Sequence, residues 1–121
     1  IVAWPDSFRQ QRQMNRLQSG YAALQKGLLA LQLHDTAGAA RQAKQAVHLL
    51  PDHAFAHYLA AEVATQQTDP ARAEHHLHQA RTAPDGDALG LVGLLRAALA
   101  RGDSARALDL ARQLRQAMGL T

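Results

Sequence analysis

The sequence predicts an all-α fold in which antiparallel helix pairs stack into an array, and two observations support this prediction. First, the pattern Asp-x-x-x-Ala recurs with a period of 34 residues. Second, an apolar column with the same period follows each copy of that pattern. The sequence shows no sustained period-two alternation bounded by hairpin turns, so no β-sheet is expected. The two columns are Asp35–Ala39, Asp69–Ala73 and Asp103–Ala107, and Ala46, Ala80 and Leu114.

A 34-residue period is typical of the tetratricopeptide repeat, in which each unit is one helix pair. The chain resembles this family at Gly27 and Ala61, which stand where two helices approach closely, and at Pro51, which closes a unit. The resemblance implies about three repeats in a right-handed superhelical array. The expected units are residues 20–53, 54–87 and 88–121, preceded by an N-terminal segment of residues 1–19.

The first expected helix is an extended one at the N-terminus. A seam of apolar residues steps by three and four positions without a break, which indicates one helix from about Ser7 into the first repeat despite Gly20. Either this seam packs under the following repeats, which we favour, or its first half binds another chain and the protein self-associates. The seam consists of Met14, Leu17, Tyr21, Leu24, Leu28 and Leu31.

The second helix of each pair begins at a recognisable start signal. Asp35, Asp69 and Asp103 stand where a side-chain carboxylate can accept hydrogen bonds from the first exposed amides. Pro70 suits a first turn, because the N–H that it lacks would have no partner there. In the first repeat, small apolar residues are spaced so that they share one buried stripe. That stripe comprises Ala39, Ala43, Ala46 and Leu50.

Composition and charge limit the function classes. The chain has 121 residues, of which 47% are apolar but only 4% aromatic, so a core of Ala and Leu is expected. It contains no cysteine, which excludes disulfides, cysteine-ligated zinc and thiol catalysis. The net charge of +3 is spread along the helices without a nucleic-acid-binding motif, so nucleic acid is not an expected partner.

Arrays of this kind bind partners along a concave face, which the first helix of each pair lines. The positions that would face it here are mainly apolar, so we expect a protein or peptide partner that presents an amphipathic helix or an apolar segment. The alternative is that part of this stripe is core covered by the N-terminal helix. The carboxylate clamp of chaperone-binding members is absent, because Leu24 and Leu28 occupy two of its positions. The expected groove residues are Tyr21, Leu24, Leu28, Phe55, Tyr58, Glu62, Leu89, Val92 and Arg96, with Tyr58, Glu62 and Arg96 supplying polar orientation.

Seven histidines raise the question of a metal or heme site. His53 and His57 are four residues apart, and His75 and His78 are three apart, so each pair could contact one ion. Two ligands do not make a structural zinc site, and the Cys-x-x-Cys-His heme attachment is absent. The sequence also lacks a nucleophile elbow, a phosphate-binding loop and a paired-carboxylate motif. We therefore expect no metal, no cofactor and no catalysis.

The N-terminus indicates a nearby membrane. The apolar run Ile1–Trp4 is followed by Arg9, Arg12 and Arg16, an order typical of a chain that leaves a bilayer on its positively charged side. This order predicts a membrane segment upstream of Ile1. Residues 1–121 contain no full transmembrane segment, so this part is expected to be soluble. The alternative is a frayed end or a hydrophobic staple on the first helix.

Three Ala- and Leu-rich runs, 23–31, 59–64 and 89–98, resemble the HemY-type inner-membrane tetratricopeptide proteins. In that family two transmembrane helices precede the repeat domain, and the genes are associated with late porphyrin and heme synthesis. The resemblance implies a non-catalytic protein-interaction scaffold, the soluble domain of a protein anchored in the bacterial inner membrane on an undetermined side. Val92 stands where the family often has Arg. The alternative function is an adaptor or chaperone in secretion or envelope assembly that binds an apolar peptide or helix in its concave groove.

Overall fold

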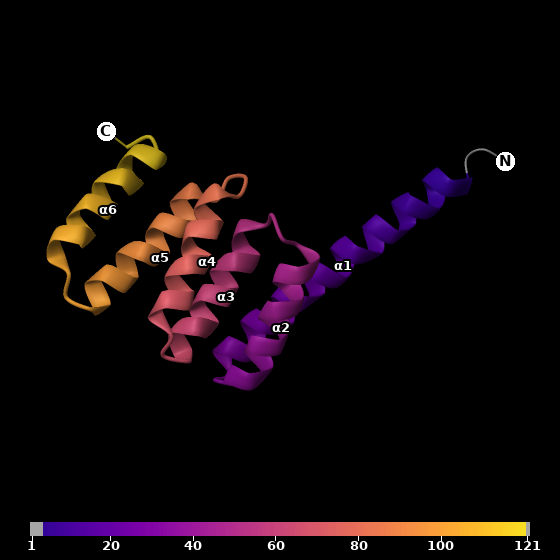
Figure 1. Ribbon diagram of the computed structural model, residues 1–121, viewed down its shortest axis with the longest axis horizontal. Helices are drawn as coiled ribbons and strands as arrows, with labels where there is room; N and C mark the ends of the chain where they lie inside the picture. Colours follow the sequence, from indigo (N-terminus) through magenta and orange to yellow (C-terminus); the bar gives the residue numbers. More distant parts are fainter. Residues whose placement is uncertain (1–3, 121) are drawn as a thin grey trace.

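The computed structural model describes residues 4–120, and within that range it contains six α-helices and no strand. The predicted all-α class is therefore confirmed. Consecutive helices pack against each other, so the chain forms adjacent antiparallel pairs (Figure 1). The helices are α1 (Trp4–Gln32), α2 (Thr36–Leu49), α3 (Ala54–Gln66), α4 (Pro70–Thr82), α5 (Asp87–Ala100) and α6 (Ser104–Ala117).

The three turns inside the helix pairs share one backbone geometry. In each turn, one residue has a positive φ, and the amide of the next residue donates to a carbonyl five positions back, at 2.9 Å. This is the Schellman arrangement, which satisfies carbonyls that the helix end leaves without partners. The positive-φ residues are His34 (59°), Thr68 (59°) and Gly102 (75°), which repeat with the period found in the sequence.

The next residue in each of these turns is the predicted capping Asp. The carboxylate of Asp35 accepts a hydrogen bond from the amide of Gly38 at 3.0 Å. In the same way, Asp69 accepts from the amide of Arg72 at 3.2 Å, and Asp103 from that of Arg106 at 3.1 Å. Pro70 occupies the first turn of α4, as its missing N–H predicts. The caps predicted from the Asp column are therefore confirmed.

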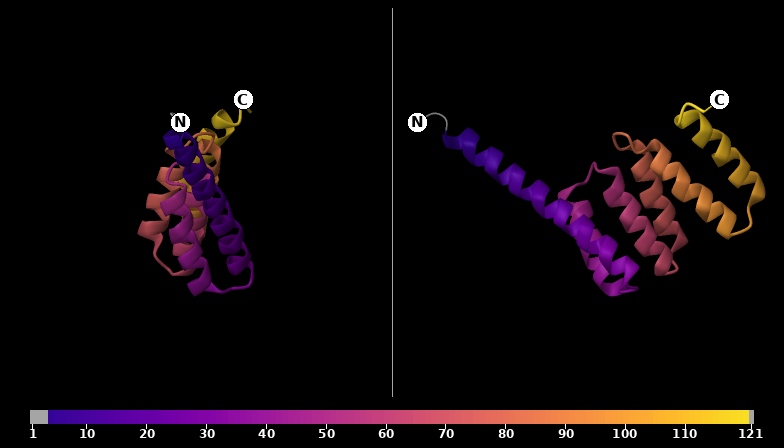
Figure 2. Two further views of the ribbon diagram at one scale, coloured as in Figure 1. Left: turned by 90° about the vertical axis from the view of Figure 1, so that its right-hand side faces the viewer. Right: turned by 180° about the vertical axis from the view of Figure 1, so that it is seen from behind.

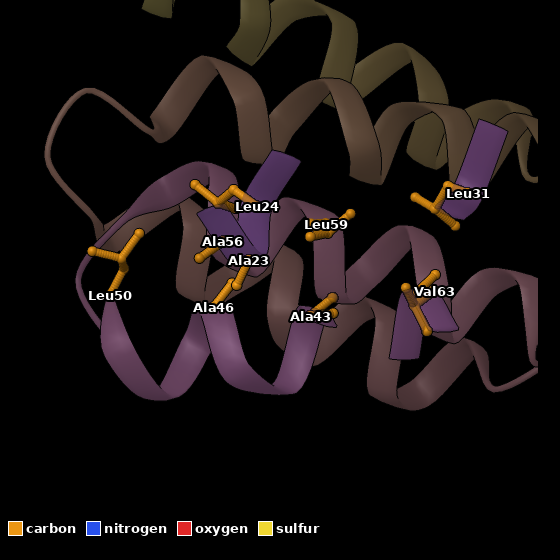
Figure 3. Packing of buried hydrophobic residues seen from close by; sticks show 11 residues of the cluster. Ala23, Leu24, Leu31, Ala43, Ala46, Leu50, Ala56, Leu59 and Val63 are labelled. Carbon is orange, nitrogen blue, oxygen red and sulfur yellow. The ribbon is translucent and has the colours of Figure 1, made fainter. Parts of the chain in front are cut away.

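The core consists mostly of Ala and Leu side chains between the helices. The predicted stripe on α2 is buried, with Ala39 and Ala46 fully covered, and it packs against α1 and α3 (Figure 3). Glycine permits a close approach of α1 to the end of α2, because a Cβ on Gly20 would lie 2.5 Å from Cγ of Leu50. A second cluster joins α3 to α6. Its buried members are Ala61, Leu77, Leu91, Leu94, Ala98, Ala107 and Leu110.

The predicted long first helix is present as α1, but its first half lies outside the core. Residues 7–19, here called the arm, are exposed, and the arm projects beyond the other helices (Figure 2). Met14 is 58% exposed and Leu17 41%, whereas Leu24 and Leu31 are buried. The expectation that the whole seam packs within the chain is therefore wrong for its first half.

The face of α1 that packs on the body explains why the arm separates from it. This face is made by Gly20, Ala23 and Gly27, which are buried and lie on one helical stripe. Continued toward the N-terminus by steps of four and three, the same stripe reaches Arg16 and then Gln13 and Arg9. Small residues that allow close packing give way to long polar ones, so the arm has no apolar surface to bury on this side.

Candidate partner-binding face

The odd-numbered helices form one layer of the array. Helix α3 packs against both α1 and α5, whereas no Cα atoms of α2 and α4, or of α4 and α6, lie within 8 Å of each other in residues 4–120. The odd helices therefore converge while the even helices spread apart. The array consequently curves so that α1, α3 and α5 line its inner side, and we call their exposed surface the inner face.

Most of the residues expected to line a groove lie on the inner face, and one does not. Tyr21 and Leu28 are 48% and 43% exposed, and Arg96 is exposed as well. Leu24 is buried in the first core cluster, so its contribution is to packing rather than to a surface. The five half-buried members of the set are Phe55, Tyr58, Glu62, Leu89 and Val92.

The three polar residues of the expected groove contact one another. Nη1 of Arg96 donates to the hydroxyl of Tyr58 at 2.8 Å and lies 3.7 Å from Oε1 of Glu62. Burial of the phenol, followed by the negative charge of Glu62, raises the pKa of Tyr58 above its ordinary value. The ring of Phe55 is 6.0 Å from that of Tyr58. An aromatic pair and an oriented guanidinium thus share the centre of the inner face.

A cleft of about 680 Å³ opens where α1 leaves the body. Three expected groove residues, Tyr21, Phe55 and Leu89, line it from three different helices. The other contributors follow no pattern in the sequence, and they come from the arm, from the α2–α3 turn and from the α4–α5 turn. They include Arg16, Leu17, Pro51, Asp52, His53, Pro84 and Asp85.

Two contacts fix the wall of this cleft. Nη2 of Arg16 donates to the backbone carbonyl of His48 at 3.1 Å, which ties the inner end of the arm to the end of α2. The ring of Tyr21 meets that of His53 edge to face, with centroids 5.7 Å apart. The α2–α3 turn is therefore held against α1 by a charged side chain and an aromatic pair.

Two histidines meet beneath the α2–α3 turn. His57 is 5% exposed, and its Nε2 lies 2.7 Å from the carbonyl oxygen of Pro51 while its Nδ1 lies 3.3 Å from Nδ1 of His76. A carbonyl only accepts, so Nε2 of His57 carries a hydrogen, and Nδ1 of the neutral ring accepts from Nδ1–H of His76. Burial, followed by the neighbouring His57, His75 and Arg72, lowers the pKa of His76 to about 4.

The histidine pairs that the sequence singled out have separate roles. Nδ1 of His53 caps α3 by accepting from the amide of Phe55 at 3.2 Å, while His57 faces His76 instead. His78 lies 3.6 Å from Glu74 on the surface of α4. Among the described residues, no three His, Cys, Asp or Glu side chains are placed to hold a metal ion.

Comparison with known proteins gives no relative for this chain. No protein-family model matches it, and neither a curated protein nor a solved structure does so. The six helices and their packed adjacent pairs are compatible with a tetratricopeptide-like helical repeat. In residues 4–120, no helix combines the length and the apolar character needed to cross a bilayer.

Proposed function

We propose that this chain is a non-catalytic protein-interaction domain of the tetratricopeptide type, with about three repeats in a right-handed superhelix. It binds an apolar peptide or an amphipathic helix on its inner face. The observation that carries the proposal is the convergence of the odd helices, which turns the surface containing Phe55, Tyr58 and Val92 inward. Concave apolar surfaces with a few oriented polar groups are typical of such recognition sites.

The inner face offers both parts of a recognition site. Apolar and aromatic side chains next to the cleft can bury the apolar stripe of a bound helix. The guanidinium of Arg96, held by Tyr58 and Glu62, can pair with a carboxylate or carbonyl of the partner. We expect the aromatic anchor to contribute more binding energy than exposed charges do, because binding energy concentrates in desolvated aromatic and arginine contacts.

Selection and mutation together test this proposal. A displayed library of helical and apolar peptides is selected on the immobilised chain, and the affinity of each selected peptide is measured by fluorescence anisotropy. Tyr58→Ala combined with Arg96→Glu should weaken binding by tenfold or more, which corresponds to about 1.4 kcal/mol. Circular dichroism should show unchanged helical content.

A matched pair of changes on the outside of the array serves as the control. Arg112 and Arg115 are exposed on α6, and their replacement by Ala should leave the affinity within about twofold. Selected peptides that are lost with the α6 arginines and retained by the inner-face variant would refute the proposed site.

For the biological setting, we propose the soluble part of a HemY-like protein anchored in the bacterial inner membrane and linked to heme synthesis. The resemblance of the runs 23–31, 59–64 and 89–98 supports it. The second candidate is an adaptor or chaperone in secretion or envelope assembly, which the cleft and the apolar inner face favour equally. The gene sequence upstream of Ile1 separates them, because two apolar spans of about 20 residues belong to the first and a cleavable signal to the second.

A further inference from the structure

The α2–α3 turn forms one wall of the cleft, and its hydrogen bonds depend on neutral histidines. Residues 49–55 all line the cleft. His53 begins α3 by accepting the amide hydrogen of Phe55 at Nδ1, which requires an unprotonated nitrogen at that position. His57 holds the carbonyl of Pro51 from below. Two imidazoles therefore hold this wall in place, because His53 caps α3 and His57 donates a hydrogen bond to Pro51.

We propose that this turn is a pH-sensitive latch, in which protonation of His53 and of the His57–His76 pair releases the cleft wall in acid. This inference rests on the proposed function, because the latch would regulate binding at the same site. Histidine is the side chain whose charge ordinarily changes between pH 5 and 8, so the latch acts in a range that cells reach.

Protonation of His53 removes the cap of α3. An imidazolium has a hydrogen on both ring nitrogens, so Nδ1 no longer accepts from Phe55. The new positive charge also lies at the N-terminus of a helix, where the helix dipole disfavours cations. The edge-to-face contact with Tyr21 then loses the hydrogen bond that orients the imidazole ring.

Protonation of the buried pair acts on the same turn from below. In the neutral state the pair has one hydrogen between two Nδ1 atoms that are 3.3 Å apart. One extra proton can be accommodated on His76, but two place like charges in contact within a half-buried site. Burial, followed by the neighbouring His57, lowers the pKa of His76, so the closed turn disfavours the charged ring. Opening of the turn relieves it, because both rings then reach water.

The charged groups around the latch act in both directions. Asp52 and Asp85 line the cleft together with His53 and bring negative charge to it. Arg16 from α1 brings a positive charge to the same cleft, and Arg72 and His75 from α4 help to lower the pKa of His76. The hydrogen bonds decide the outcome for the fold, because none of these charges replaces the acceptor that the Phe55 amide loses when Nδ1 of His53 is protonated.

The test compares the free chain at pH 7.5 and pH 5.5. Amide hydrogen exchange of Phe55, corrected for its intrinsic rate, should lose about tenfold of its protection at the lower pH. Nitrogen NMR of the rings should assign Nε2–H to His57 and Nδ1–H to His76 at pH 7.5. Protection that is equal at both pH values, or the opposite tautomers, would overturn the latch.

Three substitutions keep the hydrogen bonds and remove the titration of the three histidines. The amide oxygen of His53→Asn accepts from Phe55 at any pH, and the amide nitrogen of His57→Gln can donate to Pro51. The amide nitrogen of His76→Asn can take the place of Nδ1–H. In this triple variant the protection of Phe55 should change by less than about twofold between the two pH values. The same loss as in wild type would show that another group is responsible.

A further measurement separates this inference from the proposed function. A peptide selected on the inner face should bind about tenfold more weakly at pH 5.5 in wild type, and equally at both pH values in the triple variant. If no peptide binds, the proposed function fails while the exchange experiment still decides the latch. If the peptide binds with unchanged affinity at pH 5.5, the latch does not regulate the site.

Discussion

The turns within the helix pairs and the turns between them reverse the chain in different ways. Inside the pairs, the same backbone path recurs three times and ends each time in a capping Asp. Between the pairs, α3 is capped by a histidine, whereas Gly86 precedes α5 without a side-chain cap. The regular turns build the array, and the irregular ones line the cleft. This division indicates that the repeated turns determine the scaffold, whereas the turns that differ from the repeat form the candidate site.

The largest change in stability is expected at the buried alanine that follows each regular turn. Ala73 is 5% exposed, one turn after the capping Asp69, and its column repeats in every pair. Ala73→Phe should lower the free energy of unfolding by about 1–3 kcal/mol, because the phenyl ring has no space between the helices. Urea denaturation measures this change.

A neighbouring alanine provides the control for that substitution. Ala71 is exposed on the same helix, so Ala71→Phe should change the stability by no more than about 0.5 kcal/mol. Equal effects of the two substitutions would contradict the position of the buried column.

A smaller effect is expected at the irregular turn, where stability should depend on pH through His76. Its pKa of about 4 lies below the ordinary value of 6.5, so the native state favours the neutral ring. The resulting stability is complete above pH 6.5 and is lost as the pH falls from 6.5 toward 4. The full shift corresponds to roughly 3 kcal/mol, and we expect about 1–2 kcal/mol because the ring is only half-buried and partly screened by water.

The matched variant for this prediction is His76→Asn, whose amide nitrogen can take the place of Nδ1–H. The difference in unfolding free energy between wild type and this variant should shrink or reverse in sign as the pH falls through that window. A difference that stays constant from pH 7 to pH 4 would refute the role of His76.

The smallest change in stability is expected from the backbone conformation of the regular turn. Thr68 is exposed and β-branched, yet it has φ 59°, a conformation that disfavours such residues. Thr68→Gly should therefore raise the free energy of unfolding by about 0.5–1 kcal/mol.

The equivalent position in the last pair should respond with the opposite sign. Gly102 has φ 75° and no atoms near the site of a Cβ, so Gly102→Ala should cost about 1 kcal/mol through its backbone alone. Thermal melts of the two variants measure both changes. Shifts of the same sign would show that the two turns do not share their geometry.

The sequence was sufficient for the regular parts of the molecule. The Asp column predicted three caps and the Ala column predicted a buried stripe, because both depend on contacts within one repeat or between neighbouring ones. The positive φ of His34 and Thr68 was not predictable in the same way. A β-branched Thr disfavours that conformation and a single His is only a weak signal for it, so it follows here from the short connection between two packed helices.

The candidate site was predicted only in part. Tyr58, Glu62 and Arg96 were placed on one face by their spacing, and they contact one another. The partnership of His57 with His76 was missed, because a separation of 19 residues joins two helices and follows no helical period. Leu24 was assigned to the groove because an apolar seam does not reveal which of its members a neighbouring helix will cover.

The arm also determines how far this protein extends. A free helix of 13 residues is marginal in water, but this one continues from a half that is already packed, so it needs no new nucleus. At 1.5 Å per residue, residues 7–19 span about 20 Å. The arm is therefore a rigid spacer whose direction is set at its base, where Gly20 rests on Leu50. Any group attached to its N-terminal end is held about 20 Å from Gly20, on a helix whose inner part lines the cleft, rather than tethered loosely beside the array.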